Sequence, residues 1–268
     1  MNLFRRILSS SQTVLSAACG SDTGKRRKNN EDNFYFDGEY MPADNAGTPS
    51  ILPKTVPSDQ SCYFAVMDGM GGGDYGEIAS SSAAEAISAF LAEEENVNPC
   101  DITPSLTALC RRVNEHVFRA GENLGAYQMG ATLVSLYFHQ GQAWICDLGD
   151  SRGYLLRGDT LIRLSVDHTD EEEMKANNIT GRKPRLTQYL GIDPEAMTIV
   201  PYIHSRKVAH GDRYLLCSDG VTDMVEEERI QQLLTEADTP ESCVRQLIAA
   251  ALEAGGRDNI TAMVVDVG

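Results

Sequence analysis

A chain of 268 residues with 42% apolar residues can bury a sizeable core, and its length allows one large domain or two small ones. Its 39 acidic and 23 basic side chains give a formal charge of −16, which argues against nucleic acid or an anionic membrane as a partner, because both require a basic surface. No run approaches the roughly 18 apolar residues of a membrane span, and seven cysteines without paired spacing favour a reducing cytoplasm over a disulfide framework.

The N-terminal segment has features of a targeting signal. Two arginines and the Ala-Ala pair before Cys19 loosely suggest a signal peptide or lipobox. However, polar residues at 9–13 interrupt the apolar stretch, and Ser16 stands where a lipobox has Leu. We therefore predict a first β-strand at about residues 13–21 instead.

The next part of the chain predicts two strands and two helices. Residues 34–36 (FYF) and 62–68 (CYFAVMD) are aromatic and β-branched, which is typical of strands. Between them, residues 38–60 contain four prolines and predict a surface excursion rather than a linker between domains. Apolar residues at helical spacing predict helices over 76–95 and 102–124.

The second half of the chain begins with two predicted hairpins. Residues 131–139 and 142–150 pair across Gln140-Gly141, and residues 152–157 and 159–165 pair around Gly158-Asp159. Polar residues 170–183 predict a mobile flap with partial helix, within a flap region at about 168–190. The remaining predicted elements are strands at 198–208 and 212–219, helices at 230–234 and 243–252, and a buried strand at 260–267. Because strands form hairpins and no βαβ alternation occurs, we expect an α+β fold with antiparallel sheets.

Five short acidic segments carry the functional signal. They are RKNNED (27–32), VMDGMGG (66–72), LGDSRG (148–153), CSDGVTD (217–223) and GGRDN (255–259). Carboxylates gathered at strand ends, without His or Cys, form an all-oxygen site that suits Mg²⁺ or Mn²⁺. Arg27, four residues before Glu31, supplies a guanidinium group that fits a pair of phosphate oxygens. The joint interpretation is metal-assisted chemistry on a phosphate.

This ordered set of motifs resembles the type 2C, metal-dependent Ser/Thr protein phosphatases in their compact bacterial form, over residues 20–267. Each motif alone is common, but five in this order are specific. The resemblance implies a four-layer αββα sandwich, with two central antiparallel sheets flanked by helices and the metal site at one end. It also implies a single phosphatase domain over residues 1–268, with a core at about 13–267.

The resemblance implies a centre of two Mn²⁺ or Mg²⁺ ions, in which Asp68 bridges both ions and glycines 71–73 let the chain turn away. Its implied ligands are Glu31, Asp68, the carbonyl oxygen of Gly69, Asp219 and Asp258. A third, weaker site would be formed by Asp150 and Asp223 together with Asp219. The structural alternative for Asp150 and Asp223 is that they are turn and helix-end acids.

The resemblance also assigns roles beside the metals. Arg27 matches the phosphate-binding Arg, and only its spacing to Glu31 and Asp32 selects it from the basic run at 25–28. Asp32 matches a residue that orients bound water or this Arg. Asn259 would lie behind the ligands, with an ordinary turn residue as the alternative. Met70 stands where animal relatives have a His that is proposed as general acid.

The implied reaction is hydrolysis of phosphoserine or phosphothreonine on proteins by a metal-bridging hydroxide, while Arg27 neutralises the phosphate oxygens. No protein nucleophile is needed. Leaving-group protonation would come from metal-bound water, since Met70 cannot donate a proton; His168, the only His close to a motif, is assigned a structural or flap role. We expect phosphorylated proteins as substrates, a cognate Ser/Thr kinase as the opposing enzyme, a monomer and a cytoplasmic location.

Three other functions were weighed. A haloacid-dehalogenase phosphatase would need an Asp nucleophile where the chain has Cys217, and calcineurin-type phosphatases need His ligands that are absent. The remaining alternative is a catalytically inactive, phosphatase-like scaffold that binds phosphoproteins. Such scaffolds lose metal ligands, whereas all four implied acidic ligands of the two-metal centre are present here.

Overall fold

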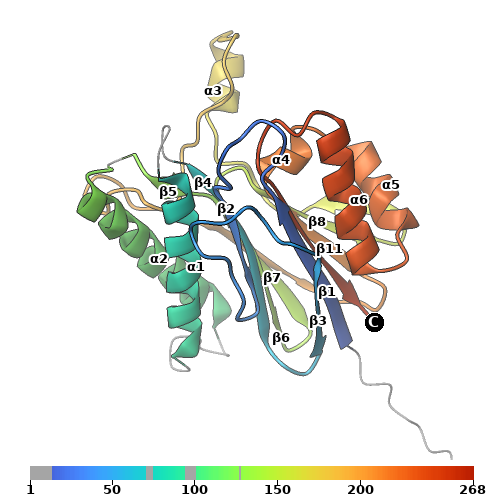
Figure 1. Ribbon diagram of the computed structural model, residues 1–268. Coiled ribbons are helices and arrows are strands. Elements are labelled where there is room, and N and C mark those ends of the chain that lie inside the picture. The colour runs from blue at the N-terminus through green and yellow to red at the C-terminus, as the bar shows by residue number, and fades with distance from the viewer. Residues whose placement is uncertain (1–13, 71–74, 94–100, 127) are drawn as a thin grey trace, which may run out of the picture.

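The computed structural model describes residues 14–70, 75–93, 101–126 and 128–268. Two antiparallel β-sheets lie face to face, and helices cover the outer face of each (Figure 1). Residue 13 of the predicted first strand, glycines 71–73 and the end of the predicted helix at 94–95 lie outside the described residues. Among the described residues, no helix is both long and apolar enough to span a bilayer.

The first sheet joins segments from both halves of the sequence. Its strands, in spatial order, are β3 (Leu52–Pro57), β1 (Val14–Asp22), β12 (Ile260–Val267), β11 (Arg213–Cys217), β8 (Arg152–Arg157) and β9 (Thr160–Arg163). β12 pairs with β1 on one side and with β11 on the other. The ends of β1 and β12 that carry Asp22 and Ile260 therefore lie together, which brings the loops at residues 23–31 and 254–259 to the same end of the sandwich.

The second sheet is built mainly from hairpins. Its strands, in spatial order, are β10 (Tyr202–Lys207), β7 (Gln142–Leu148), β6 (Leu133–His139), β4 (Cys62–Met70) and β2 (Asp32–Phe36), with the short β5 (Gly130–Ala131) beside β4. β6 and β7 pair as predicted. Their two-residue turn has positive φ at both Gln140 (48°) and Gly141 (72°), the backbone that a tight hairpin requires.

Helices form the two outer layers. α1 (Gly76–Ala92) and α2 (Ile102–Leu124) pack on the second sheet, while α4 (Asp219–Thr222), α5 (Glu227–Glu236) and α6 (Pro240–Glu253) cover the first sheet. α3 (Glu171–Ala176) lies in the flap and projects from the body of the molecule (Figure 1). This helix confirms the partial helix predicted there.

Three apolar clusters hold the four layers together. One lies between the sheets and includes Phe64, Phe138 and Tyr214, of which the last two rings meet edge to face at 5.3 Å. The other two lie between each sheet and its helices. Burial of apolar area on both faces of both sheets supplies most of the stabilisation of such an architecture. The predicted α+β class and the αββα sandwich are confirmed.

One strand was not predicted, and one predicted strand is shorter in the structure. The excursion predicted at 38–60 contains the edge strand β3, which pairs with β1. Its prolines Pro53 and Pro57 are tolerated because an edge strand needs only one side of its backbone for pairing. The strand predicted at 198–208 is shorter, at Tyr202–Lys207.

Two elements near the C-terminal end of the sequence also differ. The helix predicted at 243–252 begins earlier, at Pro240, because Thr239 and Ser242 form a reciprocal capping box. Asp219, predicted as the last residue of a strand, instead begins the short helix α4.

Candidate active site

A pocket of about 440 Å³ opens at the end of the sandwich where the loops at 23–31 and 254–259 meet. The predicted site residues that line it are Arg27, Glu31, Asp68, Gly69, Asp150, Asp219 and Asp258. These residues are up to 231 positions apart in the sequence and come from both sheets. The structure therefore brings the predicted two-metal residues together at one place.

Asp68 lies near the end of β4, and its backbone is fixed by Thr132. The Asp68 N–H donates to Thr132 Oγ1 at 2.9 Å, and Thr132 N–H donates to the Asp68 carbonyl at 2.9 Å. Thr132 Oγ1 also lies 2.7 Å from Ser151 Oγ, next to Asp150. This chain of bonds couples two of the acidic motifs. The sequence analysis missed Thr132, which belongs to none of the five motifs.

Gly69 is required by the close approach of three backbone segments. Its N–H donates to the Glu31 carbonyl at 3.0 Å. A Cβ at this position would lie 2.0 Å from the carbonyl oxygen of Gly76 and 2.5 Å from that of Glu31, far inside contact distance. The Glu31 carboxyl carbon is in turn 2.8 Å from where a Cβ on Gly76 would be, so Glu31 lies against the first residue of α1.

Asp32 lies beneath the pocket rather than in its lining. It is 1% exposed, and its Oδ2 accepts hydrogen bonds from Ser218 Oγ and Thr261 Oγ1, both at 2.7 Å. Its Oδ1 is buried and has no hydrogen-bond partner among the described residues. An orphaned carboxylate oxygen next to this pocket fits a partner such as a water held by a cation. The contacts of Asp32 are with Ser218 and Thr261, whereas those of Arg27 are with Asp258 and Glu31.

Arg27 contacts two of the acidic residues across the pocket. Its Nη2 donates to Asp258 Oδ2 at 2.7 Å, and its Nη1 lies 3.7 Å from Glu31 Oε2. The Arg27 side chain is 46% exposed, so one side of the guanidinium faces the open pocket. The acidic neighbours raise the pKa of Arg27, with the hydrogen bond that it donates to Asp258 as the largest cause.

Asn259 connects the loops that carry Arg27 and Asp258. Its Oδ1 accepts from the Glu31 N–H at 2.8 Å, and its Nδ2 donates to the carbonyls of Thr23 and Asn29, both at 2.9 Å. The side chain is 3% exposed. This geometry places Asn259 behind the acidic residues, where it fixes the backbone of Glu31.

The carboxylates of the pocket repel one another. The pKa of Asp68 is well above its usual range because of burial and the nearby charges of Asp219 and other acids. Burial and the charge of Asp219 also raise the pKa of Asp150 to about 6. Crowded carboxylates of this kind are stabilised by divalent cations, and all the donors are hard oxygens, so the residues fit Mg²⁺ or Mn²⁺.

Two protein cations lie on these carboxylates. Arg27 pairs with Asp258, and Lys183 from the flap donates to Asp219 Oδ2 at 2.5 Å and to Asp223 Oδ2 at 2.8 Å. Within the described part of the chain, no three acidic, His or Cys side chains already converge on one point that could hold an ion. Lys183 belongs to none of the five motifs and was not predicted as a site residue.

The predicted third-site residues adjoin the main pocket. Asp150, Asp219 and Asp223 line a second hollow of about 260 Å³ together with Lys183. The side chain of Asp223 is 49% exposed, whereas that of Asp219 is 14% exposed. The structure thus brings the three acids together, with the ammonium group of Lys183 on two of them.

Met70 and His168 occupy different positions relative to the pocket. Met70 lines it. His168 Nδ1 instead accepts from the Gly149 N–H at 3.3 Å and lies 3.7 Å from Asp147 Oδ2. Burial lowers the pKa of His168, so the ring is neutral near pH 7 and its approach to Asp147 is not an ion pair. His168 supports the turn before Asp150.

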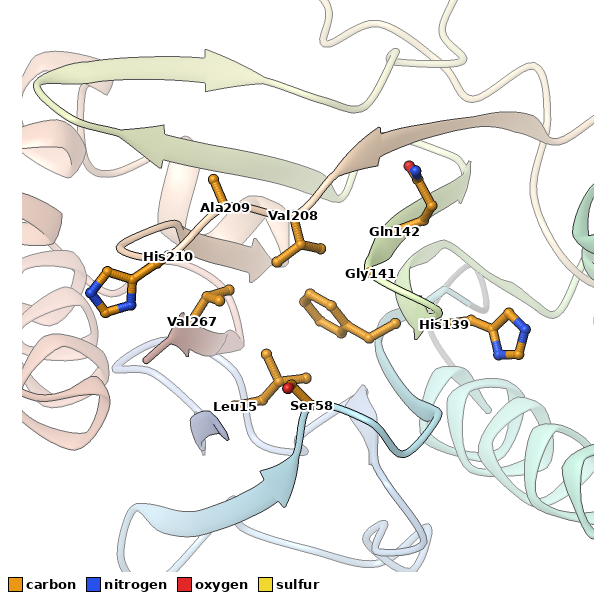
Figure 2. Close-up of a pocket in the computed structure, with 10 residues that line it drawn as sticks. Leu15, Ser58, His139, Gly141, Gln142, Val208, Ala209, His210 and Val267 are labelled. Atoms are coloured by element: carbon orange, nitrogen blue, oxygen red, sulfur yellow. The ribbon is translucent and has the colours of Figure 1, made fainter. Parts of the chain in front are cut away.

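A separate cavity of about 240 Å³ lies at the opposite end of the sandwich (Figure 2). Its apolar lining includes Leu15, Phe138, Val208 and Val267. The rings of His139 and His210 point outward on either side (Figure 2). None of the described side chains that line it is a carboxylate. The carboxylates predicted for the metal centre line the first pocket instead.

Known proteins resemble this chain over most of its length. The family model for protein phosphatase 2C matches residues 52–253. The chain is 33% identical over 259 residues to the serine/threonine protein phosphatase PstP of Mycobacterium tuberculosis, covering 95% of this chain but 45% of that protein. It is 32% identical over 265 residues to the serine/threonine phosphatase Stp of Listeria monocytogenes, covering 92% of this chain and 93% of that protein.

A solved structure shows the same architecture. The catalytic domain of PstP in complex with two manganese ions is 30% identical to this chain, with a TM-score of 0.73 over 95% of this chain and 99% of that one. The fold and the match of the family model define the class of protein. The chain belongs to the protein phosphatase 2C family, and it spans about 45% of the length of PstP of Mycobacterium tuberculosis.

Proposed function

We propose that this protein is a metal-dependent phosphatase that hydrolyses phosphoserine and phosphothreonine on other proteins. The observation that carries the proposal is the single pocket in which Arg27 lies among the carboxylates of Glu31, Asp68, Asp219 and Asp258. Family membership supports it, as do the relatives, which are themselves called serine/threonine phosphatases.

The ligands that we propose for two Mn²⁺ or Mg²⁺ ions are Glu31, Asp68, the Gly69 carbonyl, Asp219 and Asp258. The crowding of these carboxylates supports this choice, as does the related catalytic domain with two manganese ions. When bound, divalent ions would neutralise the phosphate and make the attacking water more acidic. We propose that the attack occurs on phosphorus, in line with the departing seryl or threonyl oxygen.

The chain's own side chains orient the substrate. The exposed side of the Arg27 guanidinium faces the pocket, where it can donate two parallel hydrogen bonds to phosphate oxygens. Asp258 and Glu31 contact this guanidinium at 2.7 Å and 3.7 Å. Asn259 fixes the Glu31 backbone and so maintains the spacing between Arg27 and the acidic residues. Met70 has no transferable proton, so the departing oxygen is protonated from water.

A catalytically inactive scaffold that binds phosphoproteins is the second candidate. Its expected signature is the loss of acidic ligands. Glu31, Asp68, Asp219 and Asp258 are all present and line one pocket, which favours the enzyme.

The cellular setting follows from the proposed reaction. We propose that the enzyme reverses the action of a Ser/Thr kinase in the cytoplasm. The six described cysteines are free thiols, which is consistent with a reducing compartment. We also propose that the enzyme acts as a monomer.

Turnover of a phosphothreonine peptide, with and without divalent ions, tests the proposal. We expect turnover with Mn²⁺ or Mg²⁺, poor turnover with Zn²⁺, and none after chelation. Asp219→Asn should show at least about a thousandfold slower turnover, because metal binding and nucleophile activation fail together. Tight phosphopeptide binding without turnover in any metal would favour the scaffold, and full activity after exhaustive chelation would exclude metal-dependent hydrolysis.

A further inference from the structure

Lys183 extends from the flap onto two carboxylates of the candidate active site. Its Nζ lies 2.5 Å from Asp219 Oδ2 and 2.8 Å from Asp223 Oδ2. Lys183 and Asp150 each line both the main pocket and the adjoining hollow. A positive charge of the protein therefore lies on the carboxylate pair that the family resemblance relates to a third ion.

The base of the flap holds this lysine in place. Arg182 pairs with Asp170 at 2.6 Å, and the Arg185 N–H donates to Asp170 Oδ1 at 2.8 Å, so Asp170 binds the residues on both sides of Lys183. The Asp170 N–H donates in return to the Arg185 carbonyl at 2.9 Å. Pro184 restricts the Lys183 backbone to extended conformations. These constraints lower the entropy that the Lys183 contact must overcome.

A divalent ion and Lys183 would need the same oxygen atoms. The ammonium group is at hydrogen-bond distance from one Oδ2 of each acid, and a metal ion binds a carboxylate oxygen at about 2.0–2.6 Å. Two positive charges that share these oxygens would repel each other strongly. Because the Asp219 side chain is only 14% exposed, solvent screens this repulsion incompletely.

We propose that Lys183 and a divalent cation compete for the Asp219–Asp223 pair. This competition sets the affinity of the weakest ion site, and it determines whether the flap is held against the pocket. At low metal concentration, Lys183 keeps the flap attached to Asp219 of α4 and to Asp223, which follows α4. At high metal concentration, the ion replaces the ammonium group and releases the flap. The inference rests on the proposed metal centre and adds a determinant of its affinity.

Manganese binding tests the competition without an activity assay. Free Mn²⁺ would be titrated by electron paramagnetic resonance against the wild type, Lys183→Gln and Lys183→Arg. Lys175→Gln is the matched control, because Lys175 lies in α3 of the same flap and pairs with Glu171 and Glu172 instead. We expect the weakest Mn²⁺ to bind roughly three- to tenfold more tightly to Lys183→Gln, a range that suits a partly exposed ion pair. Lys183→Arg and Lys175→Gln should resemble the wild type.

Hydrogen exchange of residues 168–190 gives the second measurement. The wild type should protect the flap without metal and lose this protection as the weakest site fills. Lys183→Gln should show the unprotected flap at every Mn²⁺ concentration, while Lys183→Arg should behave as the wild type. Hydrogen exchange thus reports directly whether the contact of Lys183 with Asp219 and Asp223 holds the flap.

The outcomes separate this inference from the proposed function. Tight binding of two Mn²⁺ with no effect of Lys183→Gln on the weakest ion or on the flap would refute the competition and leave the phosphatase assignment intact. If the wild type binds no Mn²⁺ at all, the proposed metal centre and the competition are both wrong. If Lys175→Gln increases the affinity for the weakest Mn²⁺ as much as Lys183→Gln does, the effect is one of net charge. That result would also refute the competition.

Discussion

Asp32 and Asp68 are register partners on β2 and β4, and both carboxyl groups have pKa values above their usual range. Burial is the largest cause in each case, and each group is also affected by other acids of the pocket. Like charges directly opposite one another destabilise an antiparallel pair. The end of the second sheet is therefore less stable without a cation than its apolar packing alone would make it.

Replacing Asp68 by Asn should separate stability from activity. We expect Asp68→Asn to raise the melting temperature of the metal-free protein by roughly 2–6 °C, because one of the crowded charges is removed. The same variant should lose at least about a thousandfold in turnover and most of the stabilisation by Mn²⁺. Melting curves with chelator and with Mn²⁺ measure both effects, and Asp238→Asn, at an exposed position, is the control. Lower metal-free stability together with wild-type turnover would show that Asp68 is misassigned.

Arg27→Ala tests the phosphate contact. We expect kcat/KM for a phosphopeptide to fall by roughly ten- to a thousandfold, with a higher KM, which corresponds to about 1.4–4 kcal/mol of lost charge-assisted hydrogen bonding. Metal binding should persist, since Arg27 supplies no metal ligand. Arg26→Ala, at the neighbouring exposed position, should have little effect. If Arg26→Ala lowers kcat/KM and Arg27→Ala does not, Arg26 is the phosphate-binding residue instead.

Asp150 and Asp223 can be tested with two substrates. A seryl oxygen is a poor leaving group that needs a proton, whereas p-nitrophenolate leaves without one. If these acids support that proton transfer, Asp150→Ala and Asp223→Ala should slow phosphoserine-peptide turnover far more than p-nitrophenyl phosphate turnover. Parallel loss on both substrates would mean that the two acids support the main site or the fold. No loss on either would leave them as turn residues.

Asp147 predicts a dependence of stability on pH. Its side chain is 1% exposed, and burial raises its pKa to about 8 from 3.8. Between these values the folded state binds more protons than the unfolded state, so its contribution to stability falls as pH rises and is lowest above pH 8. We expect Asp147→Asn to flatten this slope and to be more stable than the wild type at pH 9 by about 1–3 kcal/mol. Urea unfolding with chelator from pH 5 to 9 measures this. If the free energy of unfolding of Asp147→Asn depends on pH as that of the wild type does, the pKa of Asp147 is not raised in the folded protein.

Much of the fold could be predicted because local patterns and tertiary packing agree. The hairpins follow from turn residues between alternating strands, and α1 and α2 follow from their apolar periodicity. The strand β3 could not be predicted, because Pro53 and Pro57 argue against a strand unless the strand is known to lie at an edge. Edge position is a property of the assembled sheet and is not encoded in six residues.

The predicted site was incomplete for a similar reason. Acidic residues beside glycine can be recognised in sequence, and the pocket contains those predicted for the two-metal centre. Ser218, Thr261 and Thr132 cannot be recognised in this way, because hydroxyl side chains are common and their partners lie far away in sequence. Lys183 was missed because a basic residue in a polar flap looks like any solvated charge until the contact with Asp219 is seen.

The position of β12 has a consequence for synthesis of the protein. β12 lies inside the first sheet, between β1 and β11, and the pocket requires both Arg27 and Asp258. When only about the first two hundred residues have left the ribosome, neither the first sheet nor the pocket is complete. The hydrogen bond between Arg27 and Asp258, 231 positions apart, cannot form before both residues have been synthesised. The candidate active site can therefore form only after β12 has been inserted between β1 and β11.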